Sequence, residues 1–194
     1  MLLLGSKLIG TNVLSLQTGH PIGATTRPVI DPGSLKILAY FVDGPLIKQQ
    51  PENILRIDEV REFGSMGMIV DSIEDLVAKD DVVKIKQILS LNFGLIGHRV
   101  VTKKGKKVGK VTDYSLDSNS FIIQQLIVHR PLMNSFNVPE VTIHRSQIIE
   151  IDDYKVVIDD DRSKVPAAAN TVASKNTGFI NPFRKEEVAE AAEN

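Results

Sequence analysis

At 194 residues the chain suits one ordinary domain or two small ones, and its 42% hydrophobic and 24% charged residues are typical of a globular protein. Its net charge of -1 supplies no global field that attracts nucleic acid or an anionic membrane, so such binding requires a local patch. The absence of cysteine excludes disulfides, thiolate metal sites and cysteine nucleophiles, and it fits a cytoplasmic protein.

The amino terminus reads MLLLGSKLIG, which starts apolar but lacks the basic region and the small-residue cleavage site of a signal peptide. The apolar runs along the chain are short, far below the roughly 20 residues that a spanning helix requires. We therefore expect a cytoplasmic chain without a membrane span.

Residues 1–71 are predicted to form a first small β-domain. A turn at Asp31-Pro32-Gly33-Ser34 has proline preset for its second position and Gly33 for a left-handed conformation. The expected strands cover residues 8–16, 22–30, 35–42, 53–60 and 66–71.

Residues 72–90 are predicted to be a helical linker. Ser72 is a helix-cap residue, followed by acids that favour the first turn of a helix. Apolar residues then recur at steps of three and four, the spacing of one helical face: Val82, Ile85, Ile88 and Leu89. We expect one or two short helices that cover a barrel end or an edge strand.

Residues 91–161 are predicted to form a second β-domain because they repeat the pattern of the first. LIGTNVLSLQTGHPIGATTRPVID, from Leu8, matches LIGHRVVTKKGKKVGKVTDYSLD, from Leu95, in its glycines, its apolar-Gly pair and its final acid. Asn119 stands where Gly33 stood and also tolerates the left-handed conformation. The expected strands cover residues 99–102, 107–116, 120–128, 138–144 and 148–158.

Residues 162–194 are small and polar and lack a period for most of their length, which predicts a flexible tail. Its last part, RKEEVAEAAE, is rich in alanine and glutamate and favours a short helix that orders against a partner.

The repeat resembles the PRC-barrel family, through KVGKVTDYSLD with FIIQQLIV and through PIGATTRPVIDPGSLKILAYFV. The resemblance covers most of residues 5–160 as two copies. Relatives form small open β-barrels, among them a cytoplasmic domain of a photosynthetic reaction-centre subunit and a domain of a ribosome maturation factor. The resemblance implies two tandem barrels and a binding module without a general set of catalytic residues. We therefore expect no enzyme activity and no cofactor.

The leading functional hypothesis is an adaptor that docks protein partners through barrel edges and loops. Leu132, Met133 and Phe136 are the candidate contacts, because their loop sets large apolar groups beside a strand. A domain of about 75 residues buries only about 60 to 65% of its unfolded surface, so a partner or homodimer formation would stabilise it.

The alternative hypothesis is a ribosome- or RNA-associated factor. Five lysines lie around one predicted hairpin, where they would hold several phosphates. They are Lys103, Lys104, Lys106, Lys107 and Lys110. The opposing interpretation is a solvated turn that keeps a sheet edge soluble. No aromatic residue is interleaved with the lysines to stack bases, so phosphate contacts would dominate.

No metal site is predicted. His20, His98, His129 and His144 lack the close pairing of metal ligands and are expected at the surface, three of them beside Arg99, Arg130 and Arg145. The late acids Asp152, Asp153, Asp159, Asp160 and Asp161 lack the spacing of a calcium loop, so we interpret them as turn residues. Asp31 and Asp117 are likewise expected to bond local backbone amides.

Overall fold

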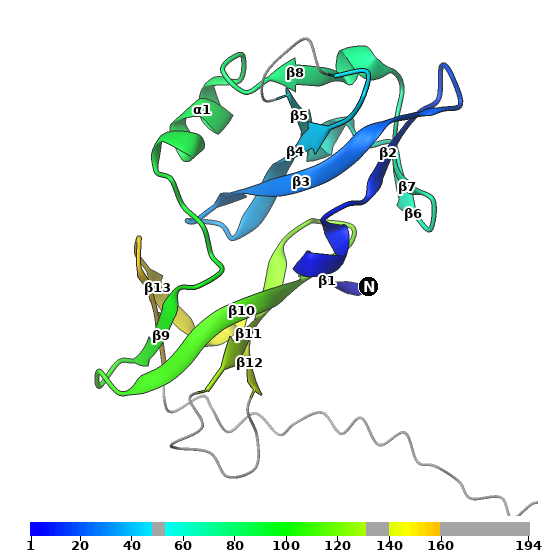
Figure 1. Ribbon diagram of the computed structural model, residues 1–194. Coiled ribbons are helices and arrows are strands. Elements are labelled where there is room, and N and C mark those ends of the chain that lie inside the picture. The colour runs from blue at the N-terminus through cyan, green and yellow to red at the C-terminus, as the bar shows by residue number, and fades with distance from the viewer. Residues whose placement is uncertain (48–52, 131–139, 160–194) are drawn as a thin grey trace, which may run out of the picture. The chain divides into compact units, whose positions relative to one another are not determined.

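The computed structural model describes residues 1–47, 53–130 and 140–159. In this part the chain is mostly β: two mixed sheets, one of them a curled half-barrel, accompany one short α-helix (Figure 1). The predicted docking residues Leu132, Met133 and Phe136 and the predicted tail at 162–194 lie outside the described residues.

The first sheet has the strand order β6-β7-β2-β3-β4-β5-β8. Its strands are β2 (Asn12–Ser15), β3 (Pro21–Asp31), β4 (Lys36–Asp43), β5 (Asn53–Arg56), β6 (Glu62–Gly64), β7 (Gly67–Val70) and β8 (Leu76–Ala78). The second sheet has the order β12-β11-β10-β9-β14-β13, and β1 pairs with β10. Its strands are β1 (Leu2–Leu4), β9 (Arg99–Thr102), β10 (Lys107–Asp117), β11 (Ile123–His129), β12 (Glu140–His144), β13 (Ile148–Ile151) and β14 (Lys155–Ile158).

The two sheets repeat one topology, as the duplicated sequence predicts. In each sheet the first hairpin strand also pairs in parallel with a late strand: β2 with β7, and β9 with β14. Val13 lies opposite Gly23 in the first sheet, and Val100 lies opposite Gly109 in the second. These registers make Asn12 the counterpart of Arg99, and Ala24 the counterpart of Lys110.

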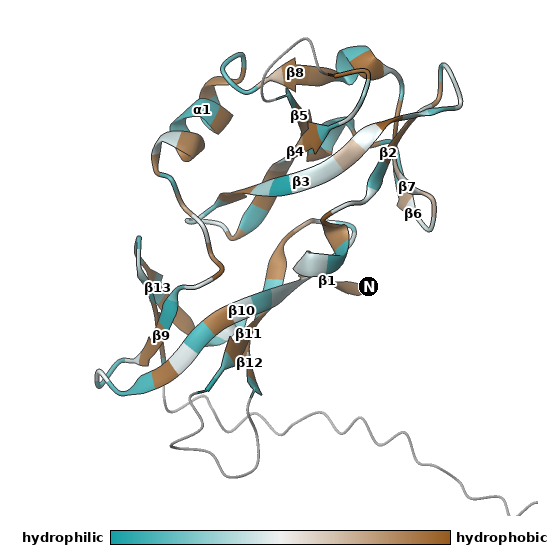
Figure 2. Cartoon of the chain, viewed as in Figure 1, coloured by the Kyte–Doolittle hydropathy of each residue, from teal (hydrophilic) through white to brown (hydrophobic). Residues whose placement is uncertain are grey.

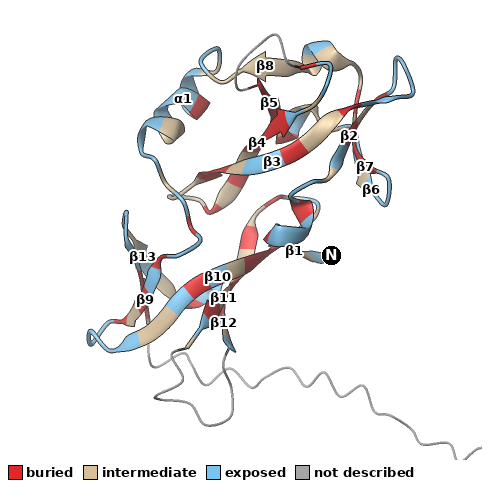
Figure 3. Ribbon diagram, viewed as in Figure 1, coloured by how far each residue is buried: buried red, intermediate tan, exposed pale blue. Residues whose placement is uncertain are grey.

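Alternation of buried and exposed side chains along the strands builds the core (Figure 3). The central strands contribute fully buried residues from both copies, among them Val13, Ile37, Val100 and Leu126. Most of these residues belong to a hydrophobic cluster that includes members of both sheets. Burial of apolar surface on this scale makes the largest favourable contribution to the stability of such a fold.

The predicted helical linker is helical in part. Helix α1 (Val83–Ser90) buries Ile85 against the face of the first sheet, and Val82, Ile88 and Leu89 pack beside it, as their spacing predicts. Ser72 caps a 3-10 turn at Ile73–Asp75 with a capping box. Leu76–Ala78 differs from the prediction: it is strand β8, which pairs with β5 and so completes an edge of the sheet. Pairing with an available sheet edge outweighs helical propensity over so short a segment.

The predicted left-handed positions are wrong by two residues in each copy. The positive φ angles belong to Leu35 (52°) and Phe121 (54°), not to Gly33 and Asn119. Both residues are buried, and each accepts a hydrogen bond from the other copy: the Ile37 amide donates to the Phe121 carbonyl, and the Ile123 amide donates to the Leu35 carbonyl, both at 2.9 Å. This reciprocal contact gives the unusual backbone a physical reason, since it holds the two sheets together.

Two further elements depart from expectation. Residues Leu2–Leu4, predicted as part of the first domain, pair with Ser115–Asp117 of the second sheet. The strand predicted over 148–158 is two strands, β13 and β14, because the chain reverses where the Asp152 carboxylate accepts the backbone amides of Tyr154 and Lys155. Among the described residues, no helix is long and apolar enough to cross a membrane.

Candidate functional site

A cavity of about 580 Å³ opens on the second sheet, and four of its nine described lining residues are arginine or lysine. We call it the basic groove. Strands β9, β10 and β14, together with the end of β11 and the residue before β14, supply its lining. The lining residues are Arg99, Val100, Val101, Lys107, Gly109, Lys110, His129, Tyr154 and Lys155.

Strand pairing brings the groove together around Lys110. On one side Lys110 lies opposite Arg99 of β9, and on the other it lies opposite His129 of β11. The parallel pairing of β14 with β9 then sets Lys155 beside Arg99. Cations that are far apart in the sequence therefore line the same cavity.

A β-bulge explains why Lys107 and Lys110 line the same cavity. Side chains alternate between the two faces of a regular strand, so residues three apart would point to opposite sides. The register shifts between Lys107 and Gly109, where β10 holds one more residue than β9. The extra residue restores both lysines to one side.

Gly109 forms part of the groove wall, at a position where only glycine fits against β11. A Cβ atom at Gly109 would lie 2.1 Å from the His129 carbonyl oxygen and 2.8 Å from Cγ1 of Val128. A larger residue therefore does not fit at Gly109, where the backbone of β10 lies close to His129 of β11.

The charge of the groove is positive. Among the described residues, Arg99, Lys107 and Lys110 form no salt bridge, while Lys155 Nζ lies 3.2 Å from Asp152 Oδ2. A hydrogen bond from the Tyr154 amide, together with bonds from Lys155, lowers the pKa of Asp152, so this carboxylate stays ionised and offsets one cation. The remaining cations are available to an anionic ligand.

The structure divides the predicted lysines into two groups. Lys107 and Lys110 line the groove. Lys103, Lys104 and Lys106 are exposed in the turn between β9 and β10 and lie outside the lining. Figure 2 shows this hairpin end as the hydrophilic tip of the second sheet.

Sequence reasoning missed Tyr154 and Lys155 as site residues and noted Arg99 and His129 only as members of His-Arg pairs. The parallel pairing of β9 with β14 joins segments that are far apart in the sequence, and no local sequence pattern predicts it. The repeat offered a signal, because β14 and β7 occupy equivalent places in the two copies. Each of these strands pairs in parallel with the first hairpin strand of its sheet.

The prediction of four surface histidines is wrong for His98. Its side chain is 6% exposed, its Nε2 lies 3.0 Å from the Asp152 carbonyl oxygen, and its ring meets Phe93 edge-on. His144 has a local role as well, since its Nδ1 accepts the Ser146 amide at the start of a 3-10 turn. Within the part of the chain that the structure describes, no group of three or more His, Cys, Asp or Glu residues is placed to hold a metal ion.

The predicted local role is confirmed for Asp31 and Asp117. Asp31 accepts the Gly33 amide at 3.0 Å, and Asp117 accepts the Ser120 amide at 3.0 Å and its hydroxyl at 2.8 Å. The hydrogen bonds from Ser120 lower the pKa of Asp117. These carboxylates are committed to the turns.

No family model matches the chain. No curated protein matches it either. The function is therefore inferred from the chemistry of the groove, which supplies cations and an aromatic ring.

Proposed function

We propose that the chain is a non-enzymatic cytoplasmic binding module whose basic groove holds single-stranded RNA. The observation that carries this proposal is the convergence of Arg99, Lys107, Lys110 and Lys155 around one cavity. Phosphates of a polynucleotide are the ligands that several cations in a row fit best, because each cation that pairs with a phosphate releases a condensed counterion.

Tyr154 favours a single strand over other polyanions. Its side chain is 81% exposed, and it lines the same groove as the cations. An exposed aromatic ring beside a basic track stacks an unpaired base, and this contact is tolerant of sequence. The sequence around the lysine hairpin contains no aromatic residue that could stack a base. In the groove, Tyr154 supplies one beside the cations.

We further propose that the two sheets are PRC-barrel-like copies. The repeated strand order and the matching positions of Gly23 and Gly109 support this interpretation. A binding role agrees with it, since the resemblance implies a binding module and function is carried by sites on a fold rather than by the fold itself.

The test is the binding of a fluorescein-labelled oligouridylate to the full chain, followed by fluorescence anisotropy at several salt concentrations. The variant Arg99→Gln, Lys110→Gln, Lys155→Gln is expected to bind about tenfold more weakly at low salt. Its plot of log affinity against log salt should also be shallower by about two, since each phosphate contact on a single strand contributes about 0.7.

A matched variant removes equal charge elsewhere: Lys7→Gln, Lys84→Gln, Lys86→Gln, all at exposed positions. It should bind nearly as the unmodified chain does. Equal loss in both variants would show that net charge alone drives binding, and the absence of any salt-dependent binding would remove the proposal altogether.

A second function, docking of a protein partner, is favoured by the outer edge of β12. The counterpart strand β5 is covered on this edge by β8, whereas β12 pairs with β11 alone among the described residues. An extended peptide that adds to β12 as β8 adds to β5 would complete the sheet. The candidate loop residues Leu132, Met133 and Phe136 come shortly before β12 in the sequence.

A pull-down with Met133→Asp and Phe136→Asp tests the docking function. Loss of a protein partner, with RNA binding unchanged, is the expected result. Retention of every partner by this variant would count against docking through this region.

A further inference from the structure

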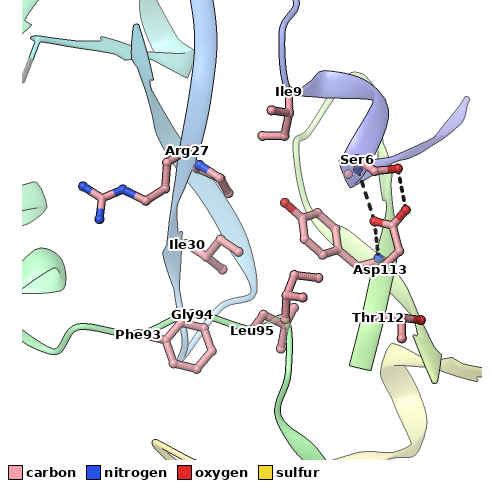
Figure 4. Close-up of a pocket in the computed structure, with 13 residues that line it drawn as sticks. Ser6, Ile9, Arg27, Ile30, Phe93, Gly94, Leu95, Thr112 and Asp113 are labelled. Carbon is pink, nitrogen blue, oxygen red and sulfur yellow. Dashed lines mark hydrogen bonds between the residues drawn. The ribbon is translucent and has the colours of Figure 1, made fainter. Parts of the chain in front are cut away.

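We propose that a second pocket, between the two sheets, binds a small organic cation: an amine that carries a compact apolar body. We call it the inter-sheet pocket. It has a volume of about 360 Å³, within the range of about 300 to 1,000 Å³ that is usual for ligand sites. Figure 4 shows it between β3 and the segments that contain Ser6, Leu95 and Asp113. This proposal does not depend on RNA binding, because the inter-sheet pocket and the basic groove share no lining residue.

The apolar part of the site comes from both copies of the repeat. Ile9 and Ile96 occupy equivalent positions in the two LIG motifs, line the pocket and remain 44% and 53% exposed. Ile30 and Phe93 add to the wall, and Figure 4 shows them on the same side as Leu95. A ligand body that covers these side chains removes apolar surface from water, which favours binding.

Asp113 supplies the charge that selects a cation. Its carboxylate accepts three hydrogen bonds, from the Ser6 amide (3.1 Å), the Ser6 hydroxyl (2.6 Å) and the Tyr114 amide (2.8 Å). Figure 4 shows the carboxylate held in this way against Ser6. Two carboxylate oxygens accept about four hydrogen bonds, so one acceptor position is left for a ligand. The fixed orientation lowers the entropic cost of using it.

The neighbouring phenol does not compete with Asp113 for a cation. Burial, together with the Asp113 charge, raises the pKa of Tyr114, so that its hydroxyl stays neutral. The negative charge in this wall of the pocket is therefore that of Asp113.

Arg27 also lines the pocket, but its charge is directed elsewhere. It occupies the position in the first copy that Asp113 holds in the second, as the registers of β3 and β10 show. Its guanidinium carbon lies 4.1 Å from the centre of the Phe41 ring. In Figure 4 the side chain points away from Ser6 and Asp113. An anion in the pocket would be repelled by the Asp113 carboxylate, and Arg27 is not directed toward it to compensate. A protonated amine would instead pair with the carboxylate.

The experiment titrates the full chain, labelled with ¹³C at isoleucine methyl groups, with benzylamine, benzyl alcohol and benzoate in turn. These probes share one ring and differ in charge. Benzylamine is expected to shift the methyl signals of Ile9, Ile30 and Ile96 with saturation, and at a concentration at least tenfold lower than benzyl alcohol requires. Benzoate should leave these signals unchanged.

The charge is tested with Asp113→Asn, and Asp58→Asn serves as the control because that exposed carboxylate lies outside the pocket. Benzylamine binding should fall to the level of benzyl alcohol in the first variant and persist in the second. Equal binding of the amine and the alcohol to the unmodified chain, or no saturable shift with benzylamine, would overturn the proposal. That comparison needs no variant, so it remains decisive even if Asp113→Asn disturbs folding.

Discussion

The same place on the two sheets is covered by a packed turn in the first sheet and borders the basic groove in the described part of the second. Above Gly23 of the first sheet, the turn after β4 folds back so that Gly44 and Ile47 pack directly on the strand: a Cβ at Gly23 would lie 3.0 Å from Cδ1 of Ile47. Ile47 is buried there. In the second sheet Gly109 lines the basic groove, and the residues that follow β11 as Ile47 follows β4 lie outside the described residues.

The residues at the groove positions also differ between the two sheets. The registers place Asn12, Pro21, Ala24 and Gly67 at the positions of Arg99, Lys107, Lys110 and Lys155. Each of these four groove cations thus has an uncharged counterpart in the first sheet. The backbone of the repeat, including its bulge, is common to both copies, so it serves the fold. The four charges occur in the second copy alone, and the proposed RNA binding rests on them.

The largest effect on stability is expected from substitution of Gly23 and Gly109. These substitutions test whether the two copies have the same backbone structure at this position. Gly109→Val and Gly23→Val should each lower the free energy of unfolding by about 3 kcal/mol, because a Cβ would lie 2.1 or 2.5 Å from a backbone carbonyl oxygen. Urea unfolding measures both. Gly64→Ala is the control, since a Cβ there has no neighbour within 4 Å, and it should change stability by no more than about 0.5 kcal/mol. Tolerance of valine at Gly109 alone would break the comparison.

Removing the filler of the first sheet should be the next largest effect. Ile47→Ala is expected to cost about 2 to 3 kcal/mol in urea unfolding, since it leaves a cavity above Gly23. RNA affinity should not rise, because the positions in the first sheet that match the groove cations are uncharged. A gain in RNA binding would show that shape, rather than charge, distinguishes the two copies.

Substitution of Tyr154 tests whether the second sheet differs from the first in RNA binding. Tyr154→Ala should weaken oligouridylate binding by about 1 to 2 kcal/mol through the loss of one stacked base, and Tyr154→Phe should restore it. The register makes Met66 the counterpart of Tyr154 in the first sheet, and Met66→Ala should leave binding unchanged. Binding of inorganic polyphosphate, which has no base, should be the same for both Tyr154 variants. Equal weakening of polyphosphate binding would assign Tyr154 a structural role instead.

The smallest expected effect concerns acid stability at a repeated turn. Hydrogen bonds from Ser120 lower the pKa of Asp117, so its contribution to stability is present above the unfolded-state value of about 3.9 and disappears as the pH falls through the lower folded-state value. The urea midpoint of the unmodified chain should therefore fall more steeply below about pH 4 than that of Asp117→Asn. Parallel curves for the two proteins would contradict this assignment.

Local patterns in the sequence predict much of this fold. The repeated glycines and acids indicate both copies, and the three- and four-residue steps around Ile85 indicate the face that α1 buries. The lysine hairpin indicates part of the groove, because Lys107 and Lys110 belong to one predicted strand, but the bulge that brings them to the same side is not evident from the sequence.

Long-range pairing accounts for what the sequence did not reveal. Lys155 and Tyr154 join the groove through a parallel contact between β9 and β14, and Leu2–Leu4 joins the second sheet through pairing with β10. The positive φ angles of Leu35 and Phe121 arise where the copies bond each other, so turn preferences alone pointed to the wrong residues. His98 is buried for a similar reason, since its partner Asp152 is distant in the sequence.

An NMR titration with a short oligouridylate tests the central claim most directly. With backbone amides assigned, addition of the oligonucleotide should shift Arg99, Gly109 and Lys110 in the second sheet. Their counterparts in the first sheet, Asn12, Gly23 and Ala24, should not move. Shifts confined to the first sheet, shifts spread equally over both, or none at saturating oligonucleotide would contradict RNA binding in the basic groove.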